Sequence, residues 1–185
     1  MKQKNKAFTL IELLITISIA WILLGIALPS FGDMLDRKKV SANVQRLVKT
    51  LQLARSTAIN DNVKVTVCPI NHSLNCTRNW STGYMSFVDT NGDRQYNQDD
   101  RVLYQYSSED ENATLSLRAF GHRNSLQWLE TGITNHQNGS FELCYSSEAD
   151  KSRALFLTKA GRIRFSKDTD GDNIHENSTG GRISC

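Results

Sequence analysis

Several features that mark common classes of protein are scarce or missing in this chain of 185 residues. It contains only two prolines and no low-complexity stretch, and apolar residues recur throughout, which excludes a disordered chain. His-Glu-x-x-His, Gly-x-Ser-x-Gly and phosphate-loop motifs are absent, and the four histidines are scattered. The sequence therefore gives no support for an enzyme, and we expect neither catalytic residues nor a cofactor.

Net charge is also scarce once the first residues are set aside. The formal charge is +3, but Lys2, Lys4 and Lys6 account for all of it, so the rest of the chain sums to zero. This balance gives no overall attraction to nucleic acid. The length suits one ordinary domain with an appendage.

The N-terminal region lacks charge over a long stretch. Between Phe8 and Leu28 the only charged residue is Glu12. This apolar run exceeds the about 7 to 15 residues of a secretory signal and is close to the roughly 20 residues that cross a bilayer. With lysines before it, we predict a single membrane-spanning segment over residues 8–29, with a cytoplasmic N-terminus and the rest of the chain outside.

The start of this run carries a specific motif. Ala7-Phe8-Thr9-Leu10-Ile11-Glu12 resembles the prepilin cleavage motif of type IV pilins and type II secretion pseudopilins, although Ala7 replaces the usual Gly. The resemblance implies a leader, residues 1–7, that a prepilin peptidase removes between Ala7 and Phe8, and N-methylation of Phe8. It also implies that Glu12 is the assembly carboxylate, and an acid inside an apolar span is by default functional.

Beyond Pro29, where this family commonly has a helix-bending proline, the pattern becomes amphipathic. Apolar residues recur in alternating steps of four and three over residues 30–60, which is typical of one buried helical face. They are Val40, Val44, Leu47, Leu51, Ala54 and Ala58. We predict one helix from Phe8 to about Ile59, bent at Pro29. Its stripe packs on a head domain or, alternatively, forms a coiled-coil homodimer.

Residues 61–185 are predicted to form one β-rich head outside the membrane. Val63, Val65 and Val67 alternate with polar residues and indicate a half-buried strand. Further strands are expected at 84–88, 102–106, 114–119, 125–129, 140–145, 154–157 and 162–165. One long helix followed by antiparallel strands is an α+β architecture. The resemblance implies a type IV pilin-like fold, with the helix packed on an antiparallel sheet.

The cysteines lie in the part predicted to be exported, where disulfides are favoured. They are Cys68, Cys76, Cys144 and Cys185. Three pairings are possible. We prefer Cys68 with Cys76, which closes a short loop, and Cys144 with Cys185, which fixes the C-terminal tail. A zinc site is disfavoured because no Cys-x-x-Cys occurs.

Two acidic loops have partial calcium-binding patterns. The first supplies oxygen ligands at the spacing of a calcium loop, but Arg94 stands where the sharp turn requires Gly. Its candidates are Asp89, Asn91, Asp93, Gln95, Asn97 and Asp100. In the second loop, Asp168, Asp170 and Asp172 have no evident closing ligand. Turns in which Asx side chains bond their own backbone explain both loops equally well, and we assign no metal.

A basic run stands out in the C-terminal part. Six cations and no acid occur between Lys151 and Lys167, although the head has 13 basic and 16 acidic residues, a net charge of −3. In the predicted hairpin of strands 154–157 and 162–165, Arg162 and Arg164 project to one side. Two arginines beside a glycine turn with open backbone amides suit phosphate oxygens. A solvated hairpin whose arginines pair with the nearby aspartates is the alternative.

Gly161-Arg162-Ile163-Arg164 resembles the Gly-Arg-x-Arg element of FimT-type minor pilins, a branch of the FimT and pseudopilin H family implicated in DNA uptake. The helix end at 53–59 and the stretch 80–93 resemble that family too. The resemblance implies a minor type IV pilin of the bacterial inner membrane, later part of a pilus at the cell surface. Its partners would be prepilin peptidase, other major and minor pilins and the assembly machinery.

With the basic run, the resemblance predicts non-sequence-specific binding of double-stranded DNA in natural transformation. The residues expected to bind it are Lys159, Arg162, Arg164, Lys167 and Arg182. The alternative is a structural or priming minor pilin, or a type II secretion pseudopilin H, that does not bind DNA.

Overall fold

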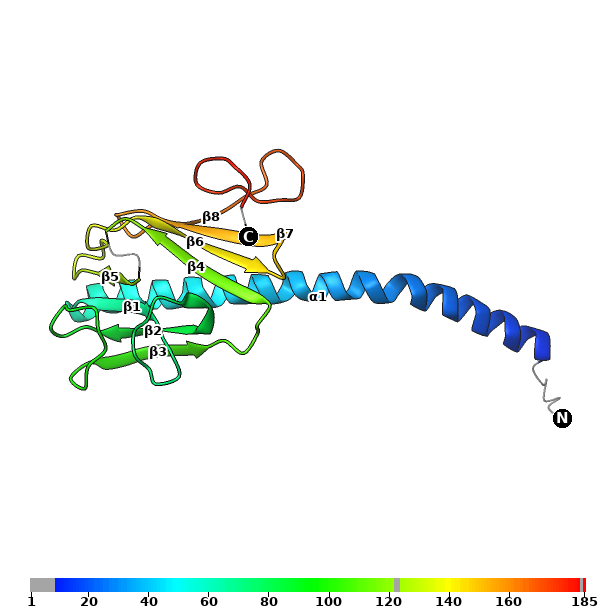
Figure 1. Ribbon diagram of the computed structural model, residues 1–185, viewed down its shortest axis with the longest axis horizontal. Coiled ribbons are helices and arrows are strands. Elements are labelled where there is room, and N and C mark those ends of the chain that lie inside the picture. Colours follow the sequence, from blue (N-terminus) through cyan, green and yellow to red (C-terminus); the bar gives the residue numbers. More distant parts are fainter. Residues whose placement is uncertain (1–8, 122–123, 184) are drawn as a thin grey trace, which may run out of the picture. The chain divides into compact units, whose positions relative to one another are not determined.

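The computed structural model describes residues 9–121, 124–183 and 185, apart from the side chains of residues 26–30. The chain divides into two compact units, residues 1–38 and 39–185. One long helix, α1 (Leu10–Asp61), contributes to both units, and the strands all belong to the second (Figure 1).

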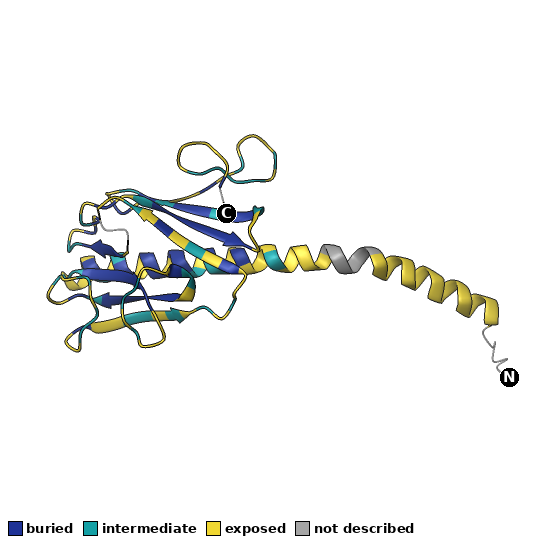
Figure 2. Cartoon of the chain, viewed as in Figure 1, coloured by how far each residue is buried: buried dark blue, intermediate teal, exposed yellow. Residues whose placement is uncertain are grey.

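The first unit consists of the N-terminal part of α1. Its apolar side chains are exposed: Leu10, Trp21 and Phe31 are 77%, 73% and 60% exposed (Figure 2). Among the described residues, no helix combines the length and the hydropathy that crossing a membrane requires. The predicted cleavage site at Ala7 and Phe8 lies outside the described residues. The bend predicted at Pro29 falls where side chains are not described.

In the second unit, the C-terminal part of α1 packs into the core of the head. All six residues of the predicted stripe, from Val40 to Ala58, are buried. They form one apolar cluster with residues of both sheets, so the stripe is covered within the chain and not by a coiled-coil partner. The helix ends at Asp61, and Asn62 at φ 55° adopts the left-handed conformation that often follows a helix.

Within the described residues, eight strands form two antiparallel sheets of four strands each, which together with α1 gives the predicted α+β architecture. The strand orders are β3-β2-β1-β5 and β4-β6-β7-β8. A 3-10 turn, Trp80–Thr82, precedes β2. The strands are β1 (Val65–Pro69), β2 (Gly83–Val88), β3 (Arg101–Ser107), β4 (Ala113–Ala119), β5 (Leu126–Trp128), β6 (Gly139–Tyr145), β7 (Glu148–Leu157) and β8 (Ile163–Phe165).

Two strand predictions need correction. β7 begins at Glu148 and not at Ala154, because its polar first half continues to pair with β6. β1 is buried on both faces, whereas the alternating sequence predicted a polar face in water. Thr66 is fully buried because the acidic loop after β2 covers it, and its hydroxyl donates to Asp89 Oδ2 at 2.6 Å.

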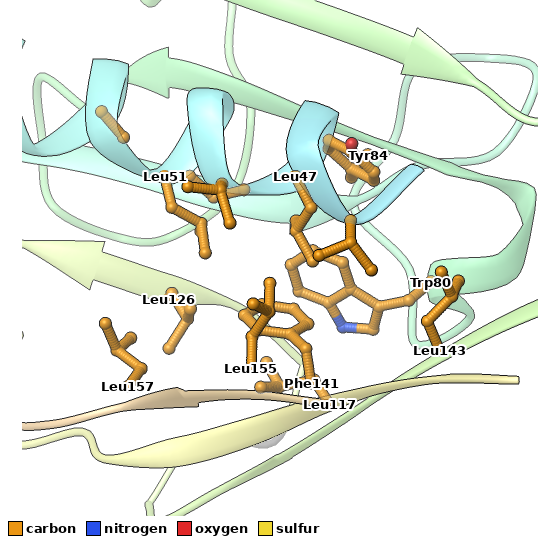
Figure 3. Close-up of a cluster of buried hydrophobic side chains, with 14 of the residues drawn as sticks. Leu47, Leu51, Trp80, Tyr84, Leu117, Leu126, Phe141, Leu143, Leu155 and Leu157 are labelled. Carbon is orange, nitrogen blue, oxygen red and sulfur yellow. The ribbon is translucent and has the colours of Figure 1, made fainter. Parts of the chain in front are cut away.

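The core joins the helix to the second sheet and so fixes the strands that carry the basic run. Leu47 and Leu51 of α1 face Leu155 of β7 across this core (Figure 3). Trp80 packs edge-on against Phe141 of β6, with ring centroids 4.9 Å apart. The inner face of β4, β6 and β7 is therefore anchored, and their other face is partly covered, with Ile183 of the C-terminal segment packed on Ala154.

Candidate nucleic-acid interface

The predicted basic hairpin is formed by β7 and β8. Phe156 pairs with Arg164 and Leu157 with Ile163, and the backbone amide of Thr158 donates to the carbonyl of Arg162 at 3.0 Å. β8 is an edge strand of the second sheet. Arg164 lies in β8 and Arg162 directly before it; both are exposed, and the two-residue repeat of an extended chain places their side chains on one side.

The tip of this hairpin is fixed to the end of α1. The guanidinium of Arg55 donates to the carbonyl oxygens of Gly161 and Ala160, each at 3.1 Å. Gly161 has φ +75°, and a Cβ there would lie 2.6 Å from the carbonyl oxygen of Gly132. Sequence reasoning missed this contact because Arg55 lies off the apolar stripe, which predicts a solvent-facing side chain.

Two of the backbone amides that were expected to be open at the glycine turn are bonded within it. The amide of Gly161 donates to the carbonyl of Thr158 at 2.8 Å, and the amide of Arg162 donates to the hydroxyl of Thr158 at 3.2 Å. These two amides are therefore satisfied by Thr158 of the same turn. The side chains of the hairpin are therefore the main candidates for holding an anion.

The basic run also does not form one patch. Lys151 is 5% exposed and its ammonium lies 2.9 Å from Glu148, while Arg153 is half-buried and donates to the carbonyls of Asp150 and Ser152. The register of β7 turns both cations away from open solvent. The exposed cations that remain in the run are Lys159, Arg162, Arg164 and Lys167, and within the described parts of the chain no carboxylate forms an ion pair with them.

Arg182, the fifth predicted contact, is different. Its guanidinium lies 2.7 Å from the carboxylate of Asp172, so a neighbouring acid offsets its charge. The pairing that was the alternative for the hairpin arginines is therefore made by the arginine of the C-terminal segment. This arrangement leaves the hairpin cations as the stronger candidates for binding an anion.

The first acidic loop uses its carboxylates to hold the head together. Asp89 is buried and accepts hydrogen bonds from Thr66, from the amides of Gly92 and Arg94, and from Gln127 Nε2 at 2.7 Å. Asp100 accepts from the backbone amides of residues 90 and 97. Sequence reasoning missed Gln127, because its partners are distant in the sequence and no local pattern marks it.

The second acidic loop gains a residue that the sequence pattern did not single out. Carboxylate oxygens of Asp168, Asp170 and Glu176 lie within 4.8 Å of one another. Asp168 also accepts from the backbone amides of Gly171 and Asn173, at 2.7 and 2.9 Å. These bonds lower the pKa of Asp168, chiefly through the amide of Gly171. They are the self-bonded Asx turns that the sequence offered as the alternative to calcium.

At the N-terminus, Glu12 takes part in the start of α1. Its carboxylate accepts from the amide and the hydroxyl of Thr9, each at 2.9 Å, and the amide of Glu12 donates to the Thr9 hydroxyl at 3.3 Å. This reciprocal arrangement is a capping box. The proposed assembly residue therefore also has a partner within its own chain.

The structure contains the disulfides that we preferred. Cys68 bonds to Cys76, and Cys144 of β6 bonds to the C-terminal Cys185. Ile183 is buried beside the second bond, in a small apolar cluster with Ala154 and Phe156. The C-terminal segment, red in Figure 1, is thus held on the second sheet near the hairpin.

Comparisons with known proteins agree with this architecture. The family model of the type II transport protein GspH matches residues 43–180, and the prokaryotic N-terminal methylation motif matches residues 2–28. The crystal structure of the type IV minor pilin FimU from Pseudomonas aeruginosa strain PAO1 is 19% identical, covers 82% of this chain and 98% of its own, and superposes with a TM-score of 0.58.

A second solved structure, the minor pseudopilin EpsH from the type 2 secretion system of Vibrio cholerae, is 16% identical. It covers 68% of this chain and 94% of its own, with a TM-score of 0.49. No curated protein matches the chain. The likeness to FimU shows a shared fold.

Proposed function

Because this chain belongs to the family of the type II transport protein GspH, we propose that it is a minor type IV pilin that binds extracellular DNA through the β7–β8 hairpin during natural transformation. The family match and the methylation motif make it a pilin-like component that is anchored in a membrane and assembles with other pilins. DNA binding is the finer part of the proposal.

The observation that carries DNA binding is the set of four exposed hairpin cations. Lys159, Arg162, Arg164 and Lys167 have no carboxylate partner among the described residues, and the tip of their hairpin, at Ala160 and Gly161, is tied to α1. The head is otherwise negative, so attraction to a polyanion is confined to this hairpin. Phosphate contacts position a duplex without reading its bases, and we therefore expect little sequence preference.

We test DNA binding with the full-length protein in a nonionic detergent, titrated against unrelated DNA duplexes at low salt. We expect a Kd of roughly 10⁻⁴ to 10⁻⁶ M at physiological salt, the range of non-specific binding, and tighter binding at low salt. Arg162→Gln/Arg164→Gln should weaken binding at least tenfold. The matched control is Lys49→Gln/Arg78→Gln, which removes the same charge from exposed positions outside the hairpin.

If the hairpin variant binds as well as the parent, the hairpin is not the site. If the parent does not bind at low salt, a structural role takes first place. The paired Arg182 and Asp172 and the negative head favour this second candidate, a priming pilin or pseudopilin H whose hairpin contacts an acidic surface of a neighbouring pilin.

The proposal includes the maturation of the chain. We propose a leader over residues 1–7, an anchor and filament-core segment over 8–29, an amphipathic helical segment over 30–60 and a head over 61–185. Coexpression with a prepilin peptidase should remove the leader and leave methylated Phe8, which intact-mass spectrometry would detect. Cleavage after Pro29, as by an ordinary signal peptidase, would contradict this maturation.

A further inference from the structure

A groove crosses the outer face of the second sheet beside the basic hairpin. Cross-strand pairing places Arg118, Ser140, Phe156 and Arg164 in one row over β4, β6, β7 and β8. Partners in such a row point to the same face, and the adjacent row, Leu117 to Leu155, points into the core. The row spans about 14 Å, or three strand spacings of about 4.8 Å.

The groove has a basic side and an aromatic side. Lys159 and Arg164 line it at the hairpin, and Arg118 and Phe120 line it at the end of β4. The C-terminal turn 177–179 forms another wall. Phe120 is 74% exposed, which is unusual for a side chain of this size in the head. The half-buried Phe156 lies between the two sides.

The floor of the groove is unsuited to phosphate. Glu142 is buried there, and its carboxylate lies 3.5 Å from the guanidinium of Arg118, which offsets much of that arginine's charge. A phosphate at the floor would be repelled by the carboxylate, whereas a base can donate an amino group to it or to the nearby Ser140 hydroxyl. A nucleic acid in this groove should therefore turn its bases inward and its phosphates toward Lys159 and Arg164.

A duplex keeps its bases stacked between its two backbones, whereas an unpaired strand can turn them inward and stack one on an aromatic ring. We infer that the groove binds a single-stranded segment of DNA, with a base stacked on Phe120 and phosphates held by Lys159 and Arg164. Aromatic platforms beside a cationic track are the usual means of binding single strands. This inference rests on the proposed function and adds a preference for unpaired DNA to it.

The test measures binding of a single-stranded oligonucleotide and of its duplex by fluorescence anisotropy, with the full-length protein in nonionic detergent. We expect the single strand to bind more tightly than the duplex. Phe120→Ala should weaken single-strand binding about tenfold, within the range measured for loss of one base–aromatic stack. It should change duplex binding less than twofold, because a duplex meets only the hairpin cations.

Phe165→Ala is the matched control. Phe165 is 54% exposed on the same hairpin but pairs with Leu155, so it lies on the opposite face of the sheet from Arg164. It should leave binding of both DNAs unchanged. The proposal that the groove binds a single strand would be overturned if Phe120→Ala and the parent bound the single strand equally well. It would also be overturned if Phe120→Ala lost the same affinity for the single strand and for the duplex.

These results separate the two proposals. If Arg162→Gln/Arg164→Gln weakens duplex binding while Phe120→Ala leaves single-strand binding intact, DNA binding stands and the groove is wrong. If the parent binds neither DNA, both are wrong.

Discussion

At the scale of single residues, Asp89 is the centre of a buried hydrogen-bond network in the head. Its carboxylate accepts from Thr66, Gln127 and two backbone amides. Asp89→Ala would leave buried donors without acceptors, which costs about 1 to 3 kcal/mol each. We expect the free energy of unfolding to fall by about 3 kcal/mol.

Thermal denaturation followed by circular dichroism measures this effect. Asp99→Ala is the control, because Asp99 is an exposed acid of the same loop, and its loss should stay within about 0.5 kcal/mol. Equal melting temperatures for the two variants would show that the buried network contributes nothing to stability.

His175 is expected to make the stability of the C-terminal segment depend on pH. Its Nδ1 lies 2.9 Å from the Ser166 hydroxyl, and burial, followed by the charge of Arg153, lowers its pKa below 6.5. The unfolded segment therefore binds a proton more readily than the folded one. Neutral His175 therefore stabilises the folded state above about pH 6.5. This stabilisation is lost as the pH falls from there toward the lowered pKa.

We expect the melting temperature to fall between pH 7 and about pH 5.5, and His175→Gln to reduce this dependence. Above pH 7, His175 should cause no change in the melting temperature of the parent. If the melting temperature of His175→Gln depends on pH in the same way as that of the parent, His175 is not the cause of this dependence.

At the scale of elements, the hairpin depends on the end of α1. Gly161→Ala would place a Cβ 2.6 Å from a backbone oxygen and 3.1 Å from Arg55 Nε, at a positive φ. We expect a loss of about 1 to 3 kcal/mol and weaker DNA binding, because the tip must move away from the helix.

Gly171→Ala is the control for Gly161→Ala, because it separates the effect of backbone strain from the effect of a steric clash. Gly171 has φ +83° but no atom within 4 Å of an added Cβ, so it suffers only the backbone strain. We expect it to retain DNA binding. Matching losses of affinity in the two variants would mean that docking of the tip does not position the cations.

Regular spacing of apolar side chains made most helices and strands predictable from the sequence. Contacts between residues that are distant in the sequence could not be predicted in this way. The helical stripe from Val40 to Ala58 and the β7–β8 hairpin follow from side-chain spacing, which is a local property. The prediction that β1 is only half-buried was wrong because Asp89, from the loop after β2, and Gln127, from the neighbouring strand β5, both reach Thr66. A charge count of the basic run also cannot show that the register of β7 hides Lys151.

At the scale of the whole molecule, we propose two roles for Glu12: it caps the start of α1 and it takes part in filament assembly. In the proposed filament its carboxylate pairs with the amine of Phe8 in a neighbouring subunit, whereas in the single chain it caps α1 with Thr9. Glu12→Ala should still be inserted and cleaved, since it makes the apolar segment more apolar, but less of it should reach the pilus.

Glu12→Gln separates the two roles, because Gln also serves in a capping box but carries no charge. Immunoblotting of sheared pili should find both variants depleted if assembly needs the carboxylate. Recovery of Glu12→Gln at the level of the parent would assign the residue to capping alone.

The central claim is that a few exposed hairpin cations hold DNA by its phosphates, and the salt dependence of binding tests it most directly. Each neutralised phosphate contributes about −0.9 to the slope of log K against log salt concentration. With four exposed cations we expect a slope of roughly −3 to −4, which Arg162→Gln/Arg164→Gln should make shallower by about 2. An unchanged slope in that variant would contradict the claim.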